Sequence, residues 1–220
     1  FIFWGTIFAF IAYNISRHFD SFEIANTNIQ NEQYEAADAA ISKYNKGSHS
    51  TLATVNGYIL QSEISNQLDR LYLSKEFATH ALEVSQKNDN QKAICISQNA
   101  LQKSKLLIGD FKDVEKPLLL CLNYFKSESN DFDTMKTLNN LMRLYLLTDS
   151  RKFISYFSQA EEIVKRKDPL RYLSVDMYIN KMFYHIQRQE SVLASEAISM
   201  AIELHKKHFS RQTTKLAYLE

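Results

Sequence analysis

The residue types that most often carry catalysis are sparse and scattered in this chain. His80 and His185 each lack a serine, cysteine or aspartate spaced as a nucleophile relay. His205 and His208 lie on neighbouring turns of a predicted helix, but two lysines separate them, so a basic helix end is a simpler interpretation than a metal site. The sequence has neither a glycine-rich phosphate loop nor an HExxH pattern. We therefore expect no catalytic residue, no metal site and no cofactor.

A pattern of amides and cations suits binding instead. Asn139 and Asn180 take the same predicted repeat position when Asp110, Asp149 and Glu190 mark the turns. An asparagine amide both donates and accepts hydrogen bonds, so it can pair with a peptide unit, while a cation can hold a carboxylate. A polar residue on an exposed helix face is also common, and that alternative stays open. The predicted ligand-binding residues are Asn99, Lys103, Asn139, Arg143 and Asn180.

The composition is that of an all-helical protein. The 220 residues include only four glycines and two prolines, and no sustained period-two alternation is present. The net charge is +1 and the basic residues are spread along the chain, so we expect no direct contact with nucleic acid. Two cysteines cannot build a disulfide framework, which favours buried thiols and a cytoplasmic location. A periplasmic or extracellular location stays open as an alternative.

The amino end allows two interpretations. Residues 1–15 carry no charge and are apolar on all sides of a helix, but the run is shorter than the roughly 20 residues that span a bilayer. Residues 1–18 are therefore either part of a membrane anchor or a buried first helix. The first alternative would add membrane association to the predicted cytoplasmic location.

Five helical pairs follow from the apolar spacing and the polar breaks. We predict a repeat domain over residues 19–208 and a helical extension or linker over residues 209–220. The predicted pairs are 19–30 with 34–45, 50–65 with 68–86, 91–108 with 111–126, 132–147 with 151–166, and 170–187 with 191–208.

One small or apolar residue recurs late in each second helix. Related positions three and seven residues earlier share its helix face. A hairpin cannot bury its apolar face alone, so a period of roughly 40 residues favours stacked hairpins with each recurring residue in the core. The recurring residues are Tyr44, Ala81, Cys121, Ala160 and Ala201.

Three segments carry a family resemblance: Asn31–Ala37, Gly109–Phe111 and Ala194–Leu204. They resemble the turn and the later alanine of tetratricopeptide repeats. The chain departs from that family because its period is longer than the family's period of roughly 34 residues. Larger residues also occupy the place of the first-helix small residue. The chain is therefore similar to the divergent, long-helix versions in bacterial sensory and regulatory proteins.

The resemblance implies an all-α, right-handed superhelical solenoid of about five antiparallel hairpins, with the first helices lining a concave face. It further implies a non-catalytic module that binds a peptide or protein segment on that face, within a larger signalling protein. A membrane-anchored scaffold and the ligand-binding half of a peptide-pheromone-responsive transcription regulator are the alternatives.

Overall fold

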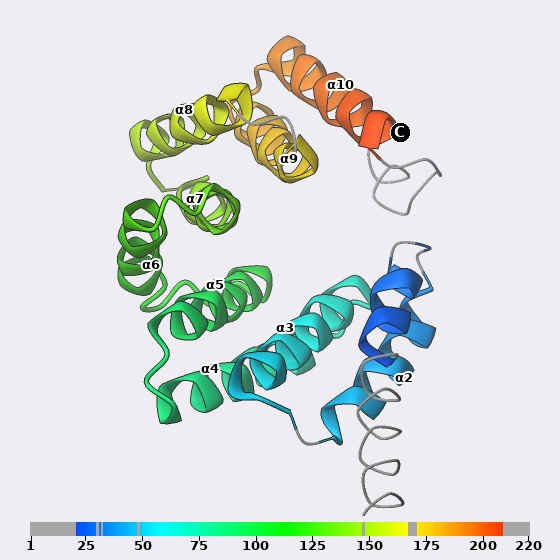
Figure 1. The fold of residues 1–220 in the computed structure, drawn as a ribbon. Helices are drawn as coiled ribbons and strands as arrows, with labels where there is room; N and C mark the ends of the chain where they lie inside the picture. Colours follow the sequence, from blue (N-terminus) through cyan, green and yellow to red (C-terminus); the bar gives the residue numbers. More distant parts are fainter. Residues whose placement is uncertain are drawn as a thin grey trace, which may run out of the picture. The chain divides into compact units, whose positions relative to one another are not determined.

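The computed structural model describes residues 21–29, 31, 33–47, 49–146, 148–166 and 171–208. Every regular element in these ranges is a helix, which confirms the predicted class. Residues 21–29 are helical, and nine longer helices follow within the described ranges (Figure 1). These are α2 (Tyr34–Asn45), α3 (Thr51–Gln67), α4 (Leu71–Lys87), α5 (Gln91–Leu107), α6 (Glu115–Ser127), α7 (Asp131–Tyr145), α8 (Ser150–Arg166), α9 (Arg171–Gln187) and α10 (Ser191–His208).

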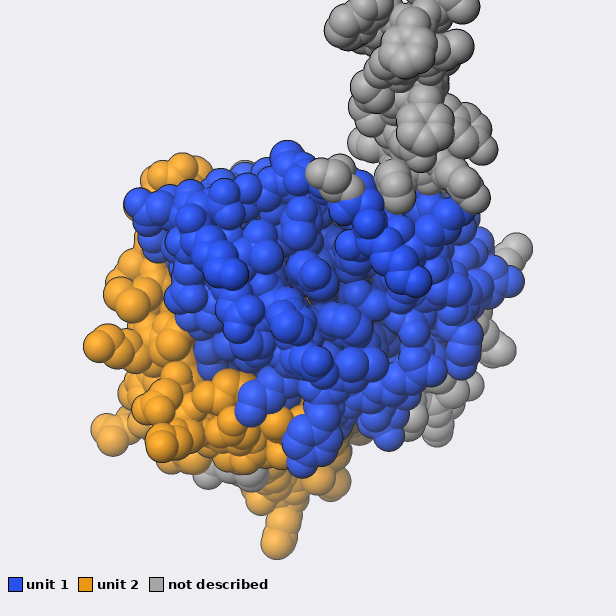
Figure 2. Space-filling view, turned by 90° about the horizontal axis from the view of Figure 1, so that it is seen from below, with its two compact units in different colours: residues 1–104 blue, residues 105–220 orange. Residues whose placement is uncertain are grey.

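Consecutive helices pack as antiparallel pairs, as the sequence predicts. The chain divides within α5 into two compact units, residues 1–104 and residues 105–220, which Figure 2 colours separately. The predicted segments 1–18 and 209–220 lie outside the described residues. Among the residues that are described, none belongs to a helix long and apolar enough to cross a bilayer.

The ends of four successive helices, α3 to α6, recur at a constant interval. A residue with positive φ follows α3, α4, α5, α6 and α9, and the first four examples are evenly spaced along the chain. The next residue then donates its N–H to the carbonyl oxygen five residues earlier, over 2.8 to 3.3 Å, which closes a Schellman turn. The positive-φ residues are Asp69, Asp89, Gly109, Ser129 and Gln189.

Small polar side chains hold the helices of the first unit together. The Ser74 hydroxyl on α4 is 2.9 Å from that of Ser62 on α3 and 2.8 Å from that of Ser104 on α5. All three side chains are buried, and each hydroxyl can both donate and accept, so the chain of contacts satisfies them in the core. Serines thus allow α3, α4 and α5 to approach closely without leaving these hydroxyls unpaired.

The core of the second unit is built around α7. Eleven of its 15 residues are buried, so α7 is covered on most sides by its neighbours. The Phe153 and Tyr184 rings stack with centroids 4.4 Å apart and join α8 to α9. Cys121 is 2% exposed, which confirms its predicted place in the core.

Two details of the predicted register are wrong. The helix predicted to begin at Phe111 begins at Glu115 instead. Asn139 and Asn180 are not equivalent. The helices α5, α7 and α9 begin at evenly spaced residues, so equivalent positions can be counted from their first residues. By this count Asn139 corresponds to Asn99, and Asn180 lies one place further along its helix. The error arises from Asp149. Asp110 and Glu190 place the equivalent position midway between them, at Ser150, and Asp149 lies one residue before it because α8 begins early.

Gly57 on α3 lies where α2 and α3 approach each other closely. A Cβ added there would lie 2.1 Å from Asn45 Oδ1 and 2.9 Å from Tyr44 Cε1. Neither neighbour moves freely, because Asn45 donates to Gln61 Oε1 over 2.7 Å and the Tyr44 ring stacks on His49. Overpacking typically costs about 1–3 kcal/mol, which exceeds the gain of about 0.5–1 kcal/mol when alanine replaces glycine in a helix.

We therefore expect Gly57→Ala to lower the free energy of unfolding, measured by urea denaturation. Asn56→Ala, at the exposed neighbouring position, is the control and should leave stability unchanged or slightly raised. A Gly57→Ala protein as stable as the parent would contradict the close approach of α2 to α3.

Candidate functional site

An open groove lies between the start of α6 and the end of α7, within the second unit. Its volume is about 610 Å³. The lining residues come from the turn before α6, from one face of α6, from the last turn of α7 and from the turn that follows it. They are Phe111, Asp113, Val114, Glu115, Lys116, Leu119, Leu120, Asn123, Leu144, Tyr145 and Thr148. We call this site the α6–α7 groove.

The apolar part of the groove is accessible to solvent. Leu120 is 59% exposed and Phe111 is 49% exposed, whereas Val114 and Leu144 lie in the core beneath them. In α4, His80 stands at the place that corresponds to Leu120, so a polar side chain occupies the position there. The corresponding residue of α10, Met200, is apolar and 39% exposed, so both polar and apolar side chains occupy this position.

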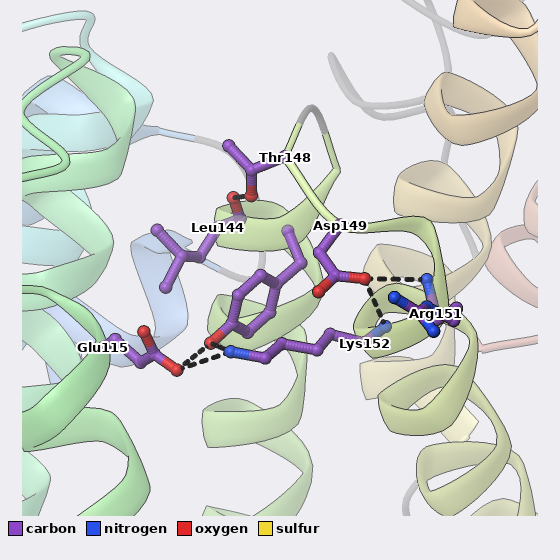
Figure 3. A network of polar contacts seen from close by, with 7 residues as sticks. Glu115, Leu144, Thr148, Asp149, Arg151 and Lys152 are labelled. Carbon is purple, nitrogen blue, oxygen red and sulfur yellow. Dashed lines mark hydrogen bonds and ion pairs between the residues drawn. The ribbon is translucent and has the colours of Figure 1, made fainter.

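Two of the lining residues, Glu115 and Tyr145, belong to a cluster of three polar side chains (Figure 3). Glu115 is on α6, Tyr145 on α7 and Lys152 on α8. The Tyr145 hydroxyl donates to Glu115 Oε1, and Lys152 Nζ donates to the same oxygen and to the Tyr145 hydroxyl, over 2.9 Å in each case. Lys152 Nζ also lies 4.5 Å from the centroid of the Tyr145 ring. One carboxylate oxygen thus joins three consecutive helices.

The start of α8 positions the lysine of this cluster. The Asp149 carboxylate accepts the backbone N–H groups of Arg151 and Lys152, over 3.0 and 3.2 Å, and so caps the first turn (Figure 3). The Thr148 hydroxyl donates to the Leu144 carbonyl oxygen over 3.3 Å. These bonds fix the turn between α7 and α8, and they place Lys152 above Tyr145.

The contacts shift the pKa of each member away from neutrality. Hydrogen bonds from Tyr145 and Lys152 lower the pKa of Glu115. Burial, followed by the bond to the Glu115 carboxylate, raises the pKa of Tyr145 to about 12. The bonds to Tyr145 and Glu115 also raise the pKa of Lys152. At neutral pH the cluster therefore holds an ionised glutamate, a neutral tyrosine and a charged lysine.

None of the five predicted ligand-binding residues lines the α6–α7 groove, although all five are described. Asn99 and Lys103 are on α5 in the first unit, with Asn99 buried and Lys103 half-buried. Asn139, Arg143 and Asn180 belong to the second unit, where Arg143 is half-buried. The five residues are thus divided between the two units, and the ligand-binding role of all five stays a prediction.

Two of these asparagines join α7 to α9. Asn139 Nδ2 donates to the Leu173 carbonyl oxygen over 3.1 Å, and Asn180 Nδ2 donates to the Asn139 carbonyl oxygen over 3.3 Å. Both side chains are at least nine-tenths buried. Among the described residues, Asn139 Oδ1 has no hydrogen-bond partner. The prediction has these amides bond to the backbone of a peptide ligand. In the structure they bond to backbone carbonyl oxygens of the protein itself.

One residue in the sequence indicates the late start of α6, but the prediction from apolar spacing did not take it into account. Pro117 falls inside the helix predicted over residues 111–126, and proline is a poor residue for a helix interior. The polar cluster had no comparable signal, because Glu115 and Tyr145 are 30 residues apart in the chain. Tyr145 on its own is one of many aromatic residues in this region.

Within the described ranges, no group of three or more His, Cys, Asp and Glu side chains is arranged to hold a metal ion. No protein-family model matches the chain, and no curated protein matches its sequence.

The raised pKa of Tyr145 predicts a specific loss of stability in alkali. A group whose pKa is higher in the folded state stabilises the fold fully below its unfolded value, which is 10.0 for tyrosine, and loses that contribution as the pH rises toward 12. Between pH 9 and pH 12 the parent protein should lose roughly 2 kcal/mol more of its unfolding free energy than Tyr145→Phe does. Urea denaturation at stepped pH measures both. If the unfolding free energy of the parent and that of Tyr145→Phe fall equally with pH, the cluster does not raise the pKa of Tyr145.

Proposed function

We propose that this chain is a non-catalytic, tetratricopeptide-like binding module, and that the α6–α7 groove binds a segment of a partner protein. In this proposal the hairpins form a right-handed solenoid of about five pairs. The even spacing of the helix ends and the repeated Schellman turn support a repeat architecture. The observation that carries the binding role is the groove itself, an open site with exposed Phe111 and Leu120 on its surface.

The dimensions and the lining of the groove favour a peptide segment. A volume of about 610 Å³ is within the range of about 300–1,000 Å³ that is typical of ligand sites. The exposed faces of Phe111 and Leu120 offer a contact for one apolar anchor side chain, the kind of residue that dominates peptide affinity. The exposed Asn123 amide, which also lines the groove, can donate to and accept from the peptide backbone.

The polar cluster supports a binding role over a catalytic one. A general acid or base works best when its pKa is near the working pH. The pKa of Glu115 is lowered and that of Tyr145 is raised to about 12, so both move away from neutrality. Because its three members satisfy one another, the cluster serves as a rigid wall against which a ligand can pack.

The experiment selects peptides from a random phage-displayed library on the immobilised chain and measures the affinity of a selected peptide by fluorescence anisotropy. Truncating an anchor contact typically costs more than about 1 kcal/mol, so we expect Leu120→Ala and Phe111→Ala each to weaken binding about fivefold or more. Both side chains are about half exposed, so neither substitution should unfold the protein.

Matched controls exist in the same unit. Leu193 is 43% exposed and Phe183 is 46% exposed, and neither lines the groove. Leu193→Ala and Phe183→Ala should leave the peptide affinity unchanged. Failure to select any peptide that binds more tightly than about 100 µM, or equal losses in groove and control variants, would contradict the proposal.

The predicted amide contacts can be tested with the same selected peptide. If Asn139 or Asn180 touches the ligand, replacement by alanine should weaken binding as well as the α7–α9 bonds. If the amides act only between α7 and α9, the two variants should lose about 0.5–1.5 kcal/mol of stability each and keep the affinity of the parent.

A further inference from the structure

The α6–α7 groove coincides with the point where the repeat is broken. The left-handed residue Gly109 closes the turn after α5, so the regular spacing of the turns places the next helix start two residues later, at Phe111. The preceding second helix, α4, begins at Leu71, two residues after Asp69, as this register requires. In contrast, α6 begins only at Glu115. Residues 111–114 form a turn in place of the first helical turn.

Proline at position 117 accounts for the missing turn. In a helix begun at residue 111, residue 117 would have to donate its N–H to the carbonyl of Asp113, four residues earlier. Proline has no N–H, and its ring collides with that carbonyl. In a helix begun at Glu115, Pro117 instead lies in the first turn, where N–H groups have no partner within the helix.

The chain before Pro117 adopts a conformation that a helix would forbid. Asp113 has φ of 55°, in the left-handed region, which reverses the local direction of the backbone. Lys105 Nζ bonds to the Lys112 carbonyl oxygen in this turn. The Asp110 carboxylate accepts the Lys112 N–H over 3.3 Å, as the N-cap residue of a helix begun at residue 111 also would, so this bond favours neither form. The left-handed φ of Asp113 is therefore the feature that distinguishes the turn from a helix.

We propose that Pro117 is the residue that creates the groove. By preventing the first helical turn, it directs Phe111, Asp113 and Val114 along the groove and leaves the first turn of α6, with Glu115 and Lys116, at its edge. Replacing Pro117 by alanine lets the helix extend back to residue 111 and restores the regular hairpin. The statement that this groove binds a partner segment rests on the function proposed above, whereas the structural role of Pro117 can be measured without a ligand.

The experiment compares two substitutions at residue 113 in two backgrounds. In the left-handed region glycine is favoured over alanine, whereas in a helix alanine is favoured over glycine. With Pro117 present, Asp113→Gly should have the higher Tm of the two variants. In the Pro117→Ala background the order should reverse, so that Asp113→Ala has the higher Tm. For a chain of this size each difference is expected to be about 2–4 °C.

Two further measurements complete the test on the whole chain. Far-UV circular dichroism should show a gain of helix in Pro117→Ala and in Pro117→Ser, but none in Lys116→Ala, which keeps the proline. The peptide selected on the parent protein should lose its affinity for Pro117→Ala, because the extended helix fills the groove.

The outcomes separate the two claims. Reversal of the Tm order together with loss of the peptide supports both the role of Pro117 and the groove as a binding site. An unchanged Tm order, with no gain of helix, would overturn the role of Pro117 even if the peptide still binds in the groove. Reversal of the Tm order with full peptide affinity would support the role of Pro117 and overturn the proposed binding site.

Discussion

The structure depends on a backbone constraint at the helix ends. A residue in the left-handed region stops each of five helices, and the next N–H bonds to the carbonyl oxygen five residues earlier. The left-handed region costs energy for most residues, so the position favours glycine and short polar side chains. Asp69, Asp89, Gly109 and Ser129 meet this requirement, and Gln189 is the exception. Because the helices and turns are similar in length, matching positions in successive hairpins have similar neighbours. The packing of successive hairpins requires such a match.

A site can arise where such a regular pattern fails locally. The α6–α7 groove occupies the place of one missing helical turn. Beside it, Glu115, Tyr145 and Lys152 bind one another across three helices. The cluster ties α6, which begins late, to α7 and α8.

Much of the fold could be predicted from the sequence because its signals are local. Scarce glycine and proline, apolar residues at helical spacing and polar breaks such as Asn88–Asn90 predict the helix pairs, and the recurring face that holds Cys121 predicts the core. The register is harder to predict, since a turn such as the one at Ser129 has no glycine to mark its left-handed residue. One misplaced marker, Asp149, is enough to make Asn139 and Asn180 look equivalent.

The candidate site was harder to predict because its contacts are tertiary. Glu115 and Lys152 are 37 residues apart in the chain, and neither has a neighbour in sequence that indicates their pairing. The asparagines were predicted as ligand contacts because an amide can bond to a peptide backbone. In the structure, Asn139 and Asn180 use that ability on α7 and α9 themselves. The same property can thus serve packing, and the ligand-binding role of these asparagines stays a prediction.

The late start of α6 is the feature on which the groove depends, and amide hydrogen exchange measures it most directly. The N–H groups of Glu115 and Lys116 are in the first turn of α6, whereas those of Lys75 and Glu76, at the equivalent places in the preceding hairpin, lie beyond the first turn of α4. Exchange followed by NMR should be fast at Glu115 and Lys116 and strongly slowed at Lys75 and Glu76. Equal protection at the two sets of positions would mean that α6 begins in register with α4, and it would contradict this account of the groove.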